Sequence, residues 1–173
     1  NQLAIRIDNT VNPNLPPDGQ KTDFIQFGGL YRDLHLVTTD PLHVTFPWEA
    51  KQAGIRLTLP EVSENRAVIL AETHVRNDSD SSRTCSLLTE IRDRDGKLVT
   101  SMTDRSEIPP GGSHDFAQTS NPIAGPELWS PDRPYLYQIH TIVRLDDKEV
   151  DRVTTPFGIR WVTWDKKEGF FLN

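Results

Sequence analysis

The sequence predicts an all-β fold with the architecture of an immunoglobulin-like antiparallel β-sandwich, and three observations support this prediction. Between residues 42 and 155, apolar residues alternate with polar ones in short runs, which is the period of half-buried strands. Clusters of Pro, Gly, Asn and Asp separate these runs at the short spacing that is typical of a sandwich. No stretch shows helical periodicity over about 12 residues, so no helix is expected.

The first predicted strands lie near the N-terminus. Residues 3–8 alternate, residues 30–37 form a second run, and a Pro-rich loop separates the two. Two strands cannot form a stable domain alone, so we expect neighbouring strands upstream of this chain. Asp40-Pro41 marks a boundary, because a proline restricts the residue before it to extended conformations.

After this boundary we expect two antiparallel sheets with seven or eight strands in all. The alternating runs are residues 42–46, 55–59, 67–75, 85–91, 98–102, 114–119, 135–143 and 149–155. The second run is expected to stop at Pro60, and Asp95-Gly96 is a strong hairpin signal. The Cys…Trp…Cys spacing of true immunoglobulin domains is absent, so the term immunoglobulin-like refers to architecture only.

Composition and charge exclude several classes of function. The hydrophobic content of 35% is low, which suits a thin two-sheet fold or a part of a larger protein. The net charge of −6 is spread along the chain. It argues against nucleic acid, which requires a basic stripe, and gives no attraction to anionic membranes. No apolar run approaches the roughly 18 residues of a spanning helix.

The N-terminus and the cysteine content bear on the compartment. Asn1 stands in a strand-like run without an initiator Met, so we expect the natural N-terminus to be missing. No signal peptide is recognisable, and the compartment stays open between cytoplasmic and periplasmic or secreted. Cys85 is the one cysteine, which excludes an intrachain disulfide. Since it alternates with apolar residues, we expect an inert buried thiol rather than a nucleophile.

The most informative segment is residues 23–36, which read Asp-Phe-Ile-Gln-Phe-Gly-Gly-Leu-Tyr-Arg-Asp-Leu-His-Leu. Asp23 precedes the flexible Gly28-Gly29 bend, and Arg32 carries a planar group that is suited to clamping a carboxylate. This pattern resembles the segment that closes the sugar-binding jelly-roll domain of glycoside hydrolase family 2, the β-galactosidase family.

Two further segments resemble the same family. Residues 127–137 read Glu-Leu-Trp-Ser-Pro-Asp-Arg-Pro-Tyr-Leu-Tyr, which is similar to a stretch of its immunoglobulin-like domain. Residues 157–161 read Phe-Gly-Ile-Arg-Trp and residues 169–173 read Gly-Phe-Phe-Leu-Asn, as in the strand that enters the catalytic barrel. The resemblance implies three parts: the end of the jelly-roll domain at 1–39, the sandwich at 40–156, and a strand and linker into an absent barrel at 157–173.

The resemblance implies a function for the parent protein rather than for this chain. Family enzymes hydrolyse β-glycosides with retention and use two barrel Glu residues, which would lie beyond residue 173. We therefore expect no catalytic residue, cofactor or metal here, and an inactive scaffold that packs on a barrel. The sequence of residues 27–32 favours a parent that hydrolyses terminal β-galactosides. The quaternary state of the parent stays open, and a homo-oligomer is one possibility. The alternative is a free-standing carbohydrate-binding or adhesion module.

Two residues are candidates for contact with substrate. The resemblance implies that Asp23 reaches into the sugar pocket of the full enzyme, where its carboxylate would accept hydrogen bonds from vicinal hydroxyls. The other interpretation is that Asp23 caps its own loop. For Arg32 we favour an ion pair or backbone clamp that joins domains, with a sugar contact as the alternative.

Other residues have simpler interpretations. Asp93 to Gly96 begins like a calcium loop but lacks its later ligands, so a hairpin turn is expected. The five histidines show no metal-ligand spacing. The four tryptophans, Trp48, Trp129, Trp161 and Trp164, could provide a sugar-stacking platform, although packing between domains is favoured.

Overall fold

The computed structural model describes residues 3–8, 29–30, 32–49 and 53–173, and its contacts divide the chain into two units, Asn1–Thr38 and Thr39–Asn173. In the first unit, none of the described residues lies in a strand. The strands predicted at residues 3–8 and 30–37 are therefore wrong for the described residues. A strand needs hydrogen bonds to a neighbouring strand, and no described strand pairs with these segments.

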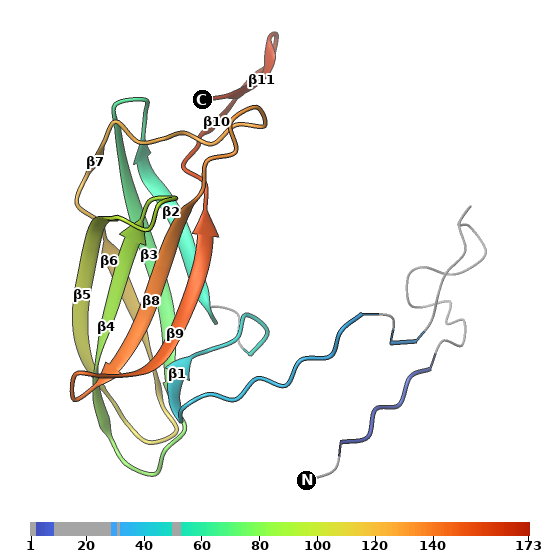
Figure 1. The fold of residues 1–173 in the computed structure, drawn as a ribbon, viewed down its shortest axis with the longest axis vertical. Helices are drawn as coiled ribbons and strands as arrows, with labels where there is room; N and C mark the ends of the chain where they lie inside the picture. Colours follow the sequence, from blue (N-terminus) through green and yellow to red (C-terminus); the bar gives the residue numbers. More distant parts are fainter. Residues whose placement is uncertain (1–2, 9–28, 31, 50–52) are drawn as a thin grey trace. The chain divides into compact units, whose positions relative to one another are not determined.

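The second unit is an antiparallel β-sandwich, as predicted (Figure 1). Its first sheet is centred on β3 (Arg66–Asn77), which pairs with four shorter strands. Leu70 to Thr73 pair with both β2 and β6, so these two strands lie on opposite sides of β3. The four partners are β1 (Leu42–Val44), β2 (Ile55–Val62), β6 (Ser113–Thr119) and β7 (Ile123–Ala124).

The second sheet has the order β5-β4-β8-β9, and every neighbouring pair is antiparallel. Its strands are β4 (Arg83–Arg92), β5 (Leu98–Ile108), β8 (Tyr137–Leu145) and β9 (Lys148–Phe157). A separate hairpin follows, made of β10 (Val162–Asp165) and β11 (Gly169–Leu172). None of the described residues forms a helix that is long and apolar enough to cross a bilayer.

All eight runs predicted after residue 40 contain a strand, but some boundaries differ. The predicted stop at Pro60 is wrong, because β2 continues to Val62 through an irregularity between Thr58 and Glu61. A proline is tolerated there because β2 is an edge strand, and its ladder is interrupted at that point. The two-residue strand β7 was not predicted, and residues 157–173, expected as one strand and a linker, contain the hairpin of β10 and β11.

Two apolar clusters fill the space between the sheets, and a polar band separates them. Leu87 and Val143 belong to one cluster, and Ile91 and Ile139 to the other. Between them along the strands lie four polar side chains with at most 2% exposure, namely Thr73, Thr89, Gln118 and Thr141. The band is linked across the sheets, because Thr89 Oγ1 donates to Gln118 Oε1 at 2.6 Å.

Cys85 lies in the first of these clusters with 1% exposure, which confirms the prediction of a buried thiol. Burial raises the pKa of the Cys85 thiol above its ordinary value. The thiolate, which is the reactive form, is therefore disfavoured.

Candidate functional site

The two residues predicted to contact sugar are in the first unit. Asp23 lies outside the described residues. Arg32 is described, and its side chain is exposed at a bend rather than in a strand. A sugar contact of Asp23, and a domain clamp or sugar contact of Arg32, are therefore untested and stay predictions.

The carboxylate of Asp93 has a structural role in the sandwich. Asp93 Oδ1 accepts hydrogen bonds from the backbone N–H groups of Asp95 and Lys97, at 3.0 and 2.9 Å. These hydrogen bonds are those of a hairpin turn. The described part of the chain holds no group of three or more metal-ligating side chains. The turn interpretation of Asp93 to Gly96 is confirmed.

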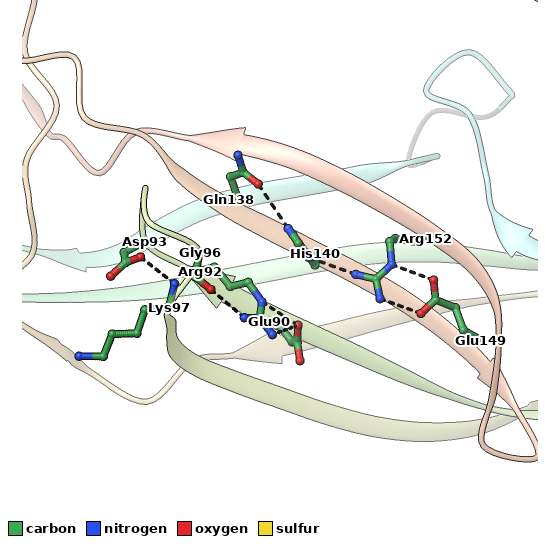
Figure 2. A network of polar contacts seen from close by, with 9 residues as sticks. All are labelled: Glu90, Arg92, Asp93, Gly96, Lys97, Gln138, His140, Glu149 and Arg152. Atoms are coloured by element: carbon green, nitrogen blue, oxygen red, sulfur yellow. Dashed lines mark hydrogen bonds and ion pairs between the residues drawn. The ribbon is translucent and has the colours of Figure 1, made fainter.

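A polar network covers part of the outer face of the second sheet (Figure 2). Arg152 on β9 forms a bidentate ion pair with Glu149, with both N···O distances 2.7 Å. Its Nη1 lies 3.1 Å from His140 Nδ1 on β8. An arginine side chain can only donate hydrogen bonds, so His140 Nδ1 is the acceptor. The other ring nitrogen of His140, Nε2, lies 3.4 Å from Gln138 Oε1.

A second ion pair lies in the same view. Arg92 on β4 binds Glu90 Oε2 through Nε and Nη2, at 3.0 and 2.9 Å, and donates from Nη1 to Gly96 O. The charges of these two ion pairs are therefore matched by neighbouring protein groups. Hydrogen bonding to Arg152 lowers the pKa of Glu149, whereas a general acid requires a raised one. The arrangement supports a structural role.

A junction near the end of the chain brings two of the sequence motifs together. Trp129 N donates to Ile159 O at 2.8 Å, and Leu128 forms a parallel bridge with Ile159. Asn173 Nδ2 donates to Trp129 O at 3.0 Å, and Asn173 Oδ1 accepts from Trp161 N at 3.2 Å. We call these four residues, Trp129, Ile159, Trp161 and Asn173, the Trp129 junction.

Side-chain packing tightens the Trp129 junction. A Cβ added to Gly158 would lie 2.9 Å from Trp129 Cβ, so no larger residue fits without movement. The guanidinium carbon of Arg160 lies 4.8 Å from the centre of the Trp129 ring, within the range of a cation–π contact. Asn173 has a φ of 63°, a left-handed conformation that Asn tolerates better than most residues. The Leu-Trp-Ser-Pro and Phe-Gly-Ile-Arg-Trp motifs thus meet at one point.

The hairpin beyond the junction exposes apolar side chains. Trp164 is 76% exposed, and Val162, Phe170 and Phe171 are also exposed. Trp164 and Phe170 contact each other edge to face, with ring centres 5.0 Å apart. A two-stranded hairpin has little stability alone. Its apolar surface therefore needs a covering partner, which the described residues do not provide.

Comparison with known proteins places the chain in a family. Residues 54–160, more than half of the chain, match the model of glycosyl hydrolases family 2. A β-galactosidase of Bacteroides ovatus, BoGH2A, is 33% identical over 100% of this chain and 19% of its own length. A β-glucuronidase of Formosa agariphila is 32% identical over 84% of this chain and 15% of its own length.

Solved structures agree with the sequence comparison. A β-glucuronidase of Bacteroides uniformis superposes with a TM-score of 0.86 at 30% identity, over 96% of this chain and 20% of that protein. The chain thus spans about a fifth or less of the length of these relatives. Relatives named as β-galactosidases and as β-glucuronidases both match. By its family match and by its identity to these relatives, the chain belongs to glycosyl hydrolases family 2.

Proposed function

We propose that this chain is the non-catalytic scaffold of a retaining β-glycosidase, situated between a sugar-binding domain and a catalytic barrel. The main support is that BoGH2A matches over 100% of this chain but only 19% of its own length. In addition, the carboxylates in the outer-face network are neutralised by arginines rather than poised as an acid and a nucleophile. The 173-residue chain is expected to be inactive by itself.

The Trp129 junction and the hairpin support this position in the parent. The exposed apolar face of β10 and β11 suits packing against a further domain. Two hydrogen bonds join Asn173 to Trp161 at the base of the hairpin, and a third, from Asn173 Nδ2 to Trp129 O, links the hairpin to the Trp129 segment. We infer that residues 1–39 belong to the sugar-binding domain, 40–156 to the sandwich, and 157–173 to the connection with the barrel.

For the substrate we propose terminal β-galactosides. The sequence Phe-Gly-Gly-Leu-Tyr-Arg at residues 27–32 favours β-galactosides, and BoGH2A is named a β-galactosidase. A second candidate is the β-glucuronides, because relatives of almost equal identity carry that name. The residues that would select one sugar are proposed to lie outside this chain.

The test compares the full-length parent with the 173-residue chain on chromogenic β-galactoside, β-glucuronide and β-mannoside. We expect hydrolysis by the parent, with the galactoside as the best substrate, and none by the chain. Hydrolysis by the chain alone would contradict the scaffold role. A parent gene that stops at Asn173, or a parent inactive on all three, would favour the free-standing module instead.

A further inference from the structure

An exposed aromatic turn follows strand β1. Residues Phe46 to Glu49, here called the aromatic turn, are closed by a hydrogen bond from Glu49 N to Phe46 O at 3.0 Å. The Phe46 and Trp48 rings stack nearly parallel, with centres 4.9 Å apart and an angle of 8°. Trp48 is 78% exposed, so Phe46 supports one face of the indole while the side chain stays open to solvent.

The base of the aromatic turn is fixed. Thr45 is 3% exposed, and its hydroxyl accepts a hydrogen bond from Gly54 N at 2.9 Å. Gly54 has a φ of 82°, and a Cβ there would lie 3.3 Å from Pro47 Cγ. The backbone of β3 also binds Gly54, because His74 N donates to Gly54 O at 3.0 Å. The turn therefore presents its indole from a rigid support.

A polar hollow of about 150 Å³ lies on the same sheet, over β2, β3 and β6. Ala53 and Ala117 line it, and their small side chains leave room between longer polar ones, namely Arg56, Glu72, His74 and Asp115. Glu72 is held by Arg56, with 2.8 Å between Nε and Oε2. Asp115 lies directly opposite His74 in the strand register.

Two groups in the hollow have unused hydrogen-bonding capacity. Among the described residues Asp115 is in no ion pair, and His74 uses only Nδ1, which lies 2.9 Å from Thr45 Oγ1. Asp115 and His74 can therefore bind further polar groups.

Contacts between supporting residues link the aromatic turn to the hollow. Thr45 joins them, because it precedes Phe46 and its hydroxyl contacts His74 in the hollow. Ala53, which lines the hollow, adjoins Gly54 against Pro47 of the turn. Arg76 lies two residues from His74 on β3; hydrogen bonding to Asp78 raises the pKa of Arg76, and the charge of Glu49 in the turn adds a smaller contribution.

We propose that the aromatic turn and this hollow form a carbohydrate-binding site for a β-linked saccharide. Trp48 would stack on the C–H face of one sugar ring, as an aromatic platform with a single open face does. Asp115 would accept hydrogen bonds from sugar hydroxyls, and His74 and the Arg56–Glu72 pair would bind further hydroxyls. The choice of a saccharide among hydroxyl-rich ligands rests on the proposed function.

Native gel electrophoresis tests the site, with soluble β-galactan, β-glucan or hyaluronan cast in the gel and dextran as the α-linked control. Both the 173-residue chain and the parent are run. We expect at least one β-linked polymer to retard both proteins. Trp48→Ala should weaken that binding about tenfold or more, the size of one lost aromatic contact. Asp115→Asn should also weaken it, through loss of a charged acceptor.

Trp164→Ala is the matched control, because it removes another exposed tryptophan that lies outside the site. It should bind like the unmodified chain, and circular dichroism should show that each variant is folded. The proposal is overturned if no polymer retards the chain, or if Trp48→Ala and Asp115→Asn both bind unchanged. Retardation of the chain but not of the parent also overturns it, since the surface is then covered in the whole enzyme. Glycoside hydrolysis by the parent is measured separately, so failure here leaves the scaffold role standing.

Discussion

The carboxylate of Asp151 and the backbone amide of Val44 join the two sheets at one edge of the sandwich. Asp151 Oδ2 on β9 accepts from Val44 N on β1 at 2.8 Å, across 107 positions of sequence. Its other oxygen accepts from Arg152 N at 2.9 Å. The contact therefore closes the space between β1 of the first sheet and β9 of the second.

The first prediction concerns this contact. Asp151→Ala should lower the free energy of unfolding by about 1–3 kcal/mol, because the Val44 amide loses a charged acceptor in a partly buried position. Urea denaturation followed by circular dichroism measures the change. Asp104→Ala on the exposed surface of β5 is the control and should change stability little. Equal stability of the two variants would show that the contact contributes nothing.

The second prediction concerns the polar band. Thr89→Val should destabilise the sandwich by about 1–3 kcal/mol, since Gln118 Oε1 then stays buried without its donor. The double variant Thr89→Val/Gln118→Leu should recover part of that loss, because both polar partners are gone. Urea denaturation of the two single variants and the double variant gives the coupling. Strictly additive losses would argue that the two side chains do not depend on each other.

The third prediction concerns Asn173. Asn173→Gly keeps the left-handed backbone available but removes both side-chain hydrogen bonds, so exchange of the Trp161 amide should accelerate about tenfold. Asn173→Asp keeps the acceptor for Trp161 but sets a carboxylate oxygen against Trp129 O. It should preserve protection of Trp161 better than the glycine variant does.

Hydrogen exchange measured by NMR distinguishes these outcomes. Asn121→Asp, at an exposed position outside the junction, is the control and should leave the Trp161 amide unaffected. If Trp161 exchanges at the same rate in the unmodified chain and in Asn173→Gly, the side chain of Asn173 does not hold the hairpin.

The fourth prediction concerns pH. Hydrogen bonding to Arg152 lowers the pKa of Glu149, so this pair stabilises the fold above the ordinary pKa of a glutamate. That contribution should be lost as the pH falls through the lowered pKa of the folded state. The pair is exposed, so the effect on stability should be small. NMR titration of the Glu149 carboxyl should show a midpoint that rises in Arg152→Ala; an unchanged midpoint would refute the assignment.

The fifth prediction concerns Asp23 in the full-length parent. If its carboxylate binds sugar hydroxyls, Asp23→Asn should lower kcat/KM by roughly 10–100-fold, the size of one charged hydrogen bond. Steady-state kinetics on the best chromogenic glycoside measure the loss, and thermal denaturation checks the fold. Unchanged kinetics in a stable protein would leave the loop cap as the role of Asp23.

The sequence was most informative where a strand buries one face. In β4 and β8, for example, Leu87, Ile91, Ile139 and Val143 mark the inward face directly, because side chains alternate along a strand. The continuation of β2 through Pro60 could not be foreseen, since it depends on β2 lying at an edge of the sheet. Residues 3–8 have the same alternation but no described partner strand, so alternation alone was not sufficient there.

The functional surfaces were less predictable, because they depend on contacts between distant residues. The sequence singled out Trp129 but gave no sign that its carbonyl would meet the Asn173 side chain, 44 positions later. The bridge between Thr89 and Gln118 required the register of two different sheets. For Trp48, the sequence shows a second aromatic residue, Phe46, two positions away, and the two rings stack. The hollow could not be predicted, because its lining comes from the separate strands β2, β3 and β6.

The buried position of Cys85 allows its reactivity to report whether the sandwich is folded. Because this single thiol is closed off between the sheets, an alkylating reagent can reach it only after β4 has separated from its neighbours. The rate of labelling at Cys85, measured by mass spectrometry in the whole enzyme, would then follow opening of the sandwich without an engineered cysteine.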